Sequence, residues 1–173
     1  MLQFRAARED DIAAIVALVE SAYRGDASRA GWTTEADLLD GQRIDAAGVG
    51  ELIPKADSRV LLAEQNGELL GCVHVEKIDD RGYFGMFSVR PTLQGGGVGG
   101  ALLAEAERVV RTAWGCTRMT CTVISIRSEL IAWYQRRGYR ATGRFEPFPY
   151  GDIRFGLPKR DDLRFEVFVK ELA

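Results

Sequence analysis

The sequence predicts an α/β (α+β) domain in which helices flank a mixed sheet of about seven strands. Some segments alternate apolar and polar residues, whereas others repeat apolar residues at helical spacing. The two kinds of segment follow one another in the order strand, helices, three strands, helix, strand, helix, two strands. With 173 residues the chain has the length of one ordinary domain, so we expect residues 1–173 to form a single domain.

The N-terminal part is predicted to contain a short strand followed by helices. Residues 2–5 alternate like a strand, and either Asp10 or Asp11 can cap a helix whose apolar side chains recur over 12–19. A polar loop follows this helix. Thr34 is the expected N-cap of a second, short helix.

Three consecutive strands are predicted next. Segments 60–64 and 69–76 alternate and are joined by Asn66-Gly67, a dipeptide that is typical of a tight hairpin turn. After a further polar turn, residues 83–89 form the third strand. Turns of this kind predict that the three strands are neighbours in one sheet.

Helices and strands alternate in the C-terminal half. Residues 101–114 are rich in Ala, Leu, Glu and Arg and predict a helix, and the β-branched segment 117–124 predicts a strand. A second helix over 128–137 ends at Gly138, which supplies the left-handed residue after a helix. The two closing strands are 139–145 and 163–170.

Composition and charge exclude several classes of partner. A formal net charge of −2 with dispersed basic residues gives no general attraction to nucleic acid or anionic lipid. No apolar run reaches the length of a membrane span and no secretion signal is visible, so we expect a cytoplasmic protein. The cysteines Cys72, Cys116 and Cys121 lack paired spacing, and with His74 as the single histidine they predict no metal site.

The segment 87–100 carries a run of glycines at the start of a predicted helix. Gly95, Gly97 and Gly100 fit the pattern G-x-G-x-x-G of dinucleotide-binding folds. However, 90–94 separates the strand from the glycines, and no acidic residue stands about twenty positions further on. No Lys-Ser/Thr pair follows either, so both nucleotide-binding patterns fit poorly.

The same residues also fit Q-x-x-G-x-G, with Gln94, Gly97 and Gly99. This pattern resembles the pyrophosphate loop of the GNAT superfamily of N-acetyltransferases. Further segments resemble the family in order and spacing, namely 89–91, 101–114, 117–124 and A132-W-Y-Q-R-R-G-Y139. The resemblance covers roughly 83–145. It implies a mostly antiparallel sheet of seven strands that is splayed at its centre, and acetyl-CoA as the cofactor.

The physics of the glycine run supports a diphosphate site. The start of a helix presents unpaired N–H groups and the positive end of the helix dipole, which together favour an anion. Glycines without side chains let these amides surround the ligand. A flexible turn with no ligand is the alternative, and it would leave about 1 kcal/mol per internal glycine uncompensated.

The resemblance implies that the pantetheine arm runs along the strand ending at Val89, whose N–H would donate to the thioester oxygen. The residues expected to contact acetyl-CoA are Phe87, Ser88, Val89, Gln94, Gly95, Gly96, Gly97, Val98, Gly99, Gly100 and Arg127. Arg127 departs from the family, in which Asn is frequent at this position. Either Arg127 reaches the cofactor phosphates or that contact is missing.

The resemblance gives Tyr134 the role of the acid that protonates the departing sulfur. The pKa values of a free tyrosine (about 10) and a thiol (about 8.5) are close enough for such a transfer. From the residues alone, Tyr134 could instead be a packed core side chain. Glu76 is the candidate base, acting directly or through water, and its alternative is a charge exposed at the end of a strand. No cysteine stands at a family nucleophile position, so we expect direct transfer.

Tyr23, Trp32 and Glu35 belong to the part of the chain that walls the acceptor site in the family. Aromatic side chains and a carboxylate there favour a small cationic amine or amino compound as acceptor. Aromatic side chains that merely cover the edge of the sheet are the alternative, and a protein amine is another acceptor. A non-catalytic sensor that binds acyl-CoA is the rival function. Homodimers are common in the family.

Overall fold

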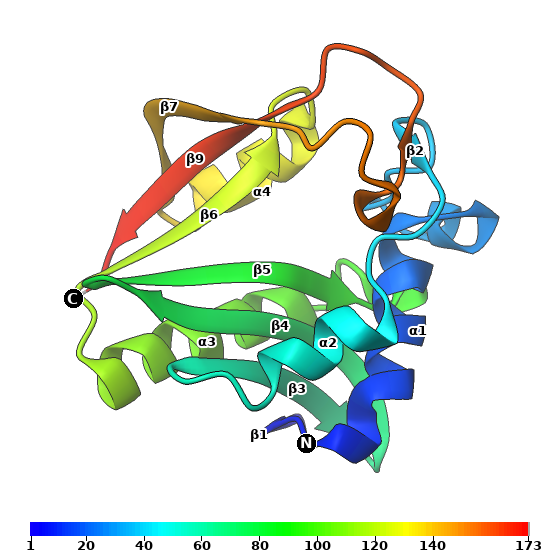
Figure 1. The fold of residues 1–173 in the computed structure, drawn as a ribbon. Helices are drawn as coiled ribbons and strands as arrows, with labels where there is room; N and C mark the ends of the chain where they lie inside the picture. Colours follow the sequence, from blue (N-terminus) through cyan, green and yellow to red (C-terminus); the bar gives the residue numbers. More distant parts are fainter. Residues whose placement is uncertain (173) are drawn as a thin grey trace.

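A seven-stranded sheet forms the middle of the molecule (Figure 1), in the order β1-β3-β4-β5-β6-β9-β7. The computed structural model describes residues 1–172, without the side chain of Asp26. The strands are β1 Gln3–Ala6, β3 Ser58–Gln65, β4 Glu68–Ile78, β5 Arg81–Val89, β6 Arg118–Ile124, β7 Arg140–Pro147 and β9 Arg164–Glu171. Neighbouring strands are antiparallel except β5 and β6. The predicted mixed, mostly antiparallel sheet is confirmed.

Turn chemistry explains the antiparallel run from β3 to β5. Asn66 and Gly67 both have positive φ, 54° and 77°, as a two-residue turn that matches the strand twist requires. Asp79, with φ 56°, opens the turn between β4 and β5. These short connections make β3, β4 and β5 sequential neighbours, as predicted.

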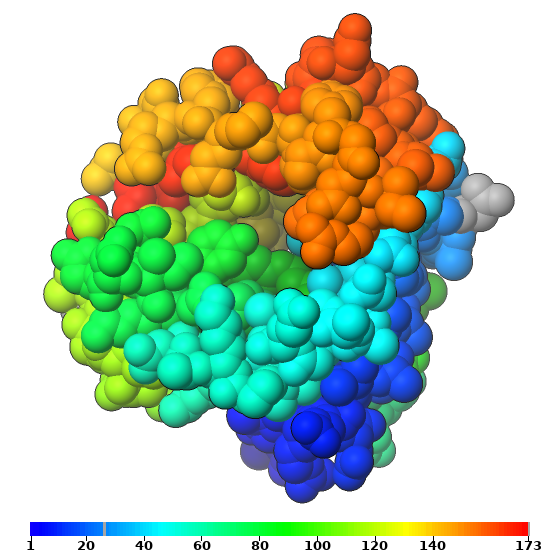
Figure 2. Space-filling view, viewed as in Figure 1, coloured from blue at the N-terminus to red at the C-terminus, as the bar shows by residue number. Residues whose placement is uncertain are grey.

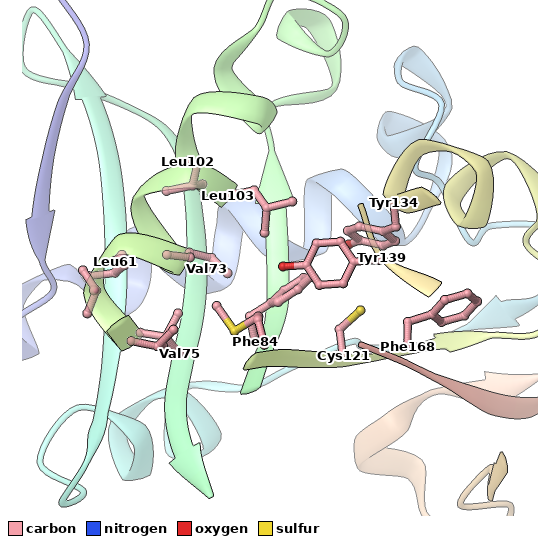
Figure 3. Close-up of a cluster of buried hydrophobic side chains, with 14 of the residues drawn as sticks. Leu61, Val73, Val75, Phe84, Leu102, Leu103, Cys121, Tyr134, Tyr139 and Phe168 are labelled. Carbon is pink, nitrogen blue, oxygen red and sulfur yellow. The ribbon is translucent and has the colours of Figure 1, made fainter. Parts of the chain in front are cut away.

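Helices flank both faces of the sheet. They are α1 Ile12–Tyr23, α2 Ala46–Leu52, α3 Val98–Trp114 and α4 Ser128–Arg136. Of these, α1, α2 and α3 pack against the N-terminal half of the sheet, and α4 lies beside β6 (Figure 1). On β3, Val60 and Leu62 belong to one buried cluster with α1, whereas Leu61 and Ala63 belong to another with α3. Figure 3 shows the second cluster, in which α3 and the ring of Tyr134 pack over the strands. Since successive strand residues face opposite sides, the all-apolar run of β3 reflects burial on both faces.

The helix predicted at Thr34 does not form. Leu38 and Leu39 both donate their N–H groups to Glu35 O, which makes one turn, and the chain then becomes extended. It pairs as β2 Leu39–Asp40 with β8 Leu157–Pro158, so a tertiary partner outweighs the local helical preference. The short 3-10 helices are η1 Glu9–Asp11, η2 Asp26–Ala30, η3 Pro91–Leu93 and η4 Ile153–Phe155. Within residues 1–172 we find no helix with the length and apolarity of a membrane span.

The sheet is splayed between β5 and β6. These two strands pair only at Gly82 with Met119 and at Tyr83 with Thr120. Beyond these pairs the strands diverge, as Figure 1 shows. Met86 sits in a left-handed conformation, φ 54°, beside a shift of register in the β4–β5 ladder, and this bulge bends β5 away from β6. The predicted splay is therefore confirmed.

Candidate active site

The splay opens into two adjoining cavities. The first, about 180 Å³, is lined by Gly95, Gly97, Gly99 and Gly100, and we call it the glycine cavity. The second, about 340 Å³, is lined by Arg24, Arg43 and Arg127, and we call it the arginine cavity. Figure 2 shows the molecule hollowed along the gap, between the green surface of β4 and β5 and the orange segment after β7. The residues that line both cavities are Tyr23, Phe87, Leu130 and Tyr134.

The glycine cavity contains an open helix start. Gly95 and Gly97 have φ near 90°, a conformation that side chains rarely adopt, which explains why glycine stands there. A Cβ on either residue would meet no atom within 4 Å, so the loop faces open space. None of the described side chains caps α3 at Gly97. The first N–H groups of the helix are therefore free to bind an anion.

Arg137 adds a cation beside this helix start. A Cβ on Gly100 would lie 3.6 Å from Arg137 Nη2, and the guanidinium lies 3.5 Å from the centre of the Trp133 ring. Its Nη1 also donates to Trp133 O at 3.2 Å. Arg137 lies in the segment 132–139 that resembles the family, but no role was predicted for it. The signal was its spacing of one helical turn from Tyr134.

The N–H of Val89 points into the gap. The next residue, Arg90, donates its N–H to Leu70 O at 3.0 Å across the β4–β5 ladder. Because alternate residues of an antiparallel strand bond to the same neighbour, Val89 N–H is directed away from β4. At this level β6 has left β5, since their last registered pair is Tyr83 with Thr120. The Val89 N–H is therefore available to a ligand.

Gln94 holds the glycine loop against two other segments. Its Nε2 donates to Thr33 Oγ1 at 2.6 Å and to Val89 O at 3.1 Å, and its Oε1 accepts from Thr33 N at 3.2 Å. A Cβ on Gly31 would overlap this side chain, so glycine permits the close approach. The Gln94 side chain, predicted to bind the cofactor, is thus engaged in joining the loop to segment 31–33.

Tyr134 lies between the two cavities with its ring in the core. It is 5 % exposed, and its ring centre lies 5.6 Å from that of Phe84 and 5.9 Å from that of Tyr139. Its hydroxyl has no hydrogen-bond partner among residues 1–172. Burial raises the pKa of Tyr134 well above its ordinary value, so the phenol stays protonated. Both interpretations of this residue, a packed ring and a proton donor facing the cavities, are compatible with its position.

Three buried charges in the arginine cavity form one network. Glu35 Oε1 lies 3.1 Å from Arg24 Nη2, and Glu35 Oε2 lies 3.2 Å from Arg127 Nη1. The side chains of Arg24, Glu35 and Arg127 are 4 %, 7 % and 9 % exposed. Arg127 also donates to Thr33 O. Arg127 therefore faces Glu35, not the glycine loop, and Glu35 offers no unpaired charge to a cationic amine.

Tyr23 and Trp32, both predicted to line the acceptor site, lie in different places relative to the two cavities. Tyr23 lines both cavities and donates its hydroxyl to Phe87 O. Trp32 lines the glycine cavity, with its ring centre 6.3 Å from that of Trp133. We therefore associate Trp32 with the cofactor side and Tyr23 with the junction.

Glu76 is not brought to either cavity. Its Oε1 lies 2.5 Å from Lys55 Nζ, and its β3 partner is Ser58, which donates to Leu52 O at the end of α2. The period of two places His74 beside it, with Nε2 2.9 Å from Ser58 Oγ. The side chains of Glu76 and His74 therefore face the side of the sheet that α2 covers, and we assign Glu76 no part in the reaction.

Three cofactor predictions fall on residues that line neither cavity. Ser88 is buried, and its hydroxyl donates to Met86 O at 3.2 Å. Val98 packs against the core cluster, and Gly96 donates its N–H to Leu93 O at 3.3 Å. Their side chains or backbone support the loop and strand around the cavity.

A sheet opened between two parallel strands, with an uncapped glycine helix start beside the gap, defines the architecture of acetyl-group transferases of the GNAT type. Residues 12–139 match the model of the Acetyltransferase (GNAT) family. The chain belongs to this family.

Individual relatives agree with this family assignment. An IAA acetyltransferase of Azospirillum brasilense is 32% identical over an alignment of 102 residues, and the match covers 57% of this chain and 65% of the relative. The alignment thus spans just under two thirds of that relative's length.

Solved structures with the same fold cover nearly the whole chain. The ribosomal-protein-S18-alanine N-acetyltransferase of Escherichia coli has a TM-score of 0.73 at 13% identity, covering 100% of this chain and 95% of that one. An IAA acetyltransferase of Bacillus cereus has a TM-score of 0.67 at 16% identity, covering 99% and 100%. At these identities the likeness shows the fold alone.

Proposed function

We propose that this chain is an N-acetyltransferase that moves the acetyl group of acetyl-CoA to the primary amine of a small amino compound by direct attack. The observation that supports the proposal is the position of Tyr134, which lines both cavities and whose hydroxyl has no hydrogen-bond partner among the described residues. A small acceptor is favoured over a protein amine because the arginine cavity holds about 340 Å³ and aromatic side chains line it. The free thiols of all three cysteines support a cytoplasmic location, and a homodimer stays a prediction.

The glycine cavity offers hydrogen-bond donors and a cation that suit the diphosphate of the coenzyme. The open N–H groups at Gly95 and Gly97 and the cation of Arg137 would hold the diphosphate. The indole rings of Trp32 and Trp133 would bound the adjoining part of the coenzyme. Bound acetyl-CoA supplies an activated acetyl group on a thiol leaving group.

Val89 and Tyr134 divide the remaining chemistry. Val89 N–H, directed into the gap, would donate to the acetyl oxygen as negative charge develops there. Tyr134 would donate a hydrogen bond to the departing sulfur. Because burial raises the pKa of Tyr134 above that of a thiol, a proton passed to sulfur must be replaced from the amine, which loses one as the amide forms. The C–S bond breaks, the C–N bond forms, and the phenol ends protonated.

The test is thiol release from acetyl-CoA over a panel of amines, with the natural chain and Tyr134→Phe. We expect Tyr134→Phe to lower kcat by about 100-fold or more, with little change in the affinity for acetyl-CoA measured by calorimetry. Tyr139→Phe is the matched control, because Tyr139 lies in the same aromatic cluster but donates its hydroxyl to Glu107 at 2.7 Å.

The outcomes separate the candidate functions. Equal rates for the natural chain and Tyr134→Phe would remove the proton-donor role. Tight binding of acetyl-CoA without turnover on any amine would favour a sensor, a function suggested by the absence of Glu76 from the cavities.

A further inference from the structure

Arg43 is a cation in the arginine cavity, and its guanidinium has no carboxylate partner among the described side chains. Its backbone N–H donates to Glu20 Oε1 at 2.5 Å, but no ion pair or hydrogen bond of its guanidinium occurs among residues 1–172. The guanidinium instead lies 5.7 Å from the centre of the Tyr23 ring. Tyr23 is a residue at which the two cavities meet. The ring of Tyr23 therefore connects Arg43 with the junction of the two cavities, where acetyl transfer is proposed to occur.

The balance of charge in the arginine cavity is positive. Arg24 and Arg127 share Glu35, so one negative charge is set against the two positive charges of these guanidiniums. Glu146 on β7 is the other acidic residue that lines the cavity, and it is exposed. Arg43 is therefore in excess.

The charge of Arg43 acts on two other residues that line the arginine cavity, Tyr83 and Arg24. Burial raises the pKa of Tyr83 on β5, and the charge of Arg43 opposes that rise. Burial lowers the pKa of Arg24. The negative charge of Glu35 opposes this lowering, whereas the positive charge of Arg43 adds to it. A half-buried guanidinium that repels a neighbouring arginine is stabilised when an anion binds beside it.

The remaining wall of the arginine cavity is aromatic. Phe148 follows β7, Phe155 lies in η4, and Phe165 lies on β9. The segment that carries Phe155 meets the one that carries Arg43 at the rim, where β2 pairs with β8, and Figure 2 shows the cyan and orange surfaces in contact there. An acceptor in this space meets several aromatic rings and the guanidinium of Arg43, which, unlike those of Arg24 and Arg127, is not paired with Glu35.

From this arrangement we propose that the acceptor is a small amino carboxylate with an apolar side chain, and that Arg43 binds its carboxylate. The guanidinium fork matches the two oxygens of a carboxylate, and the rings accommodate the apolar part. This inference rests on the proposed acetyl transfer, because the amine of the same molecule would face Val89 and Tyr134. It replaces the expected cationic acceptor with a zwitterionic or anionic one.

The test compares pairs of acceptors that differ only in the carboxylate. L-phenylalanine is paired with L-phenylalaninamide, and L-methionine with L-methioninamide, in thiol-release assays with acetyl-CoA. For the natural chain we expect kcat/KM to favour the carboxylate by about 10- to 100-fold. In Arg43→Gln that preference should fall to near unity, and Arg43→Lys should recover part of it. Arg59→Gln is the matched control, since Arg59 also lies over an aromatic ring, that of Trp114, outside both cavities.

A binding arm separates this inference from the proposed function. Calorimetry measures the binding of L-phenylalanine to the chain saturated with coenzyme A. Binding that is lost in Arg43→Gln but kept in Arg59→Gln supports the carboxylate site even if no acceptor turns over. An amide preference in the natural chain, or an equal carboxylate preference in Arg43→Gln, would overturn it.

Discussion

The buried network of Arg24, Glu35 and Arg127 should make Glu35 a determinant of stability. Glu35→Ala would leave two guanidiniums that are 4 % and 9 % exposed without their shared carboxylate. Breaking a buried ion pair by removing one partner costs about 3–5 kcal/mol. Carbonyl acceptors soften this loss, because Arg24 also donates to Gln42 O at 2.6 Å and Arg127 to Thr33 O. We therefore expect about 3 kcal/mol of lost unfolding free energy.

Thermal and urea unfolding measure this loss. For a domain of this length, about 3 kcal/mol corresponds to a fall in Tm of about 6–12 °C. Glu35→Gln, which keeps one acceptor oxygen, should lie between the natural chain and Glu35→Ala. Asp162→Ala is the matched control, because it removes a carboxylate from the exposed pair with Arg160 and should leave Tm unchanged. Glu35→Ala with the Tm of the natural chain would refute the description of a buried, interdependent network.

Two further predictions concern acid stability and coenzyme affinity. Burial lowers the pKa of His74 to about 4, so unfolding takes up a proton between pH 4 and 6.5, and stability that is present above pH 6.5 is lost as the pH falls toward 4. This loss should reach about 3 kcal/mol in urea titrations and should be smaller in His74→Gln, whereas parallel pH profiles would contradict it. Gly97→Glu places a carboxylate at the open helix start, and calorimetry should show at least about a tenfold weaker binding of coenzyme A. Gly143→Glu, at another positive-φ glycine with open space around it, should retain the affinity; equal affinities in both variants would remove the loop from the coenzyme site.

Local signals in the sequence predicted the frame of the site. Asn66-Gly67 determines the β3–β4 hairpin through its own backbone preferences, and the glycines at 95 and 97 mark a loop whose backbone only glycine adopts easily. Such signals depend on a few adjacent residues, so they can be interpreted without the fold. The helix expected at Thr34 failed because β8, more than a hundred residues further on, supplies a partner for Leu39.

The contents of the arginine cavity were beyond sequence reasoning because they join distant segments. Arg24, Glu35 and Arg127 come from three separate parts of the chain, and no spacing rule relates them. The period of two placed His74 and Glu76 on one face of β4 but not on a particular face, since one face looks like the other in sequence. A signal for Arg137 did exist, in its spacing from Tyr134 on α4.

The thin seam between β5 and β6 has a mechanical consequence. Only two registered residue pairs join β5 to β6, so few backbone hydrogen bonds connect the two halves of the sheet. A ligand bound between the two strands would stabilise the sheet there, because it would supply β5 with the hydrogen-bond partner that β6 does not provide. We expect amide hydrogen exchange in both strands to slow when coenzyme A is added, and unchanged exchange would mean that the halves are already rigid without a ligand.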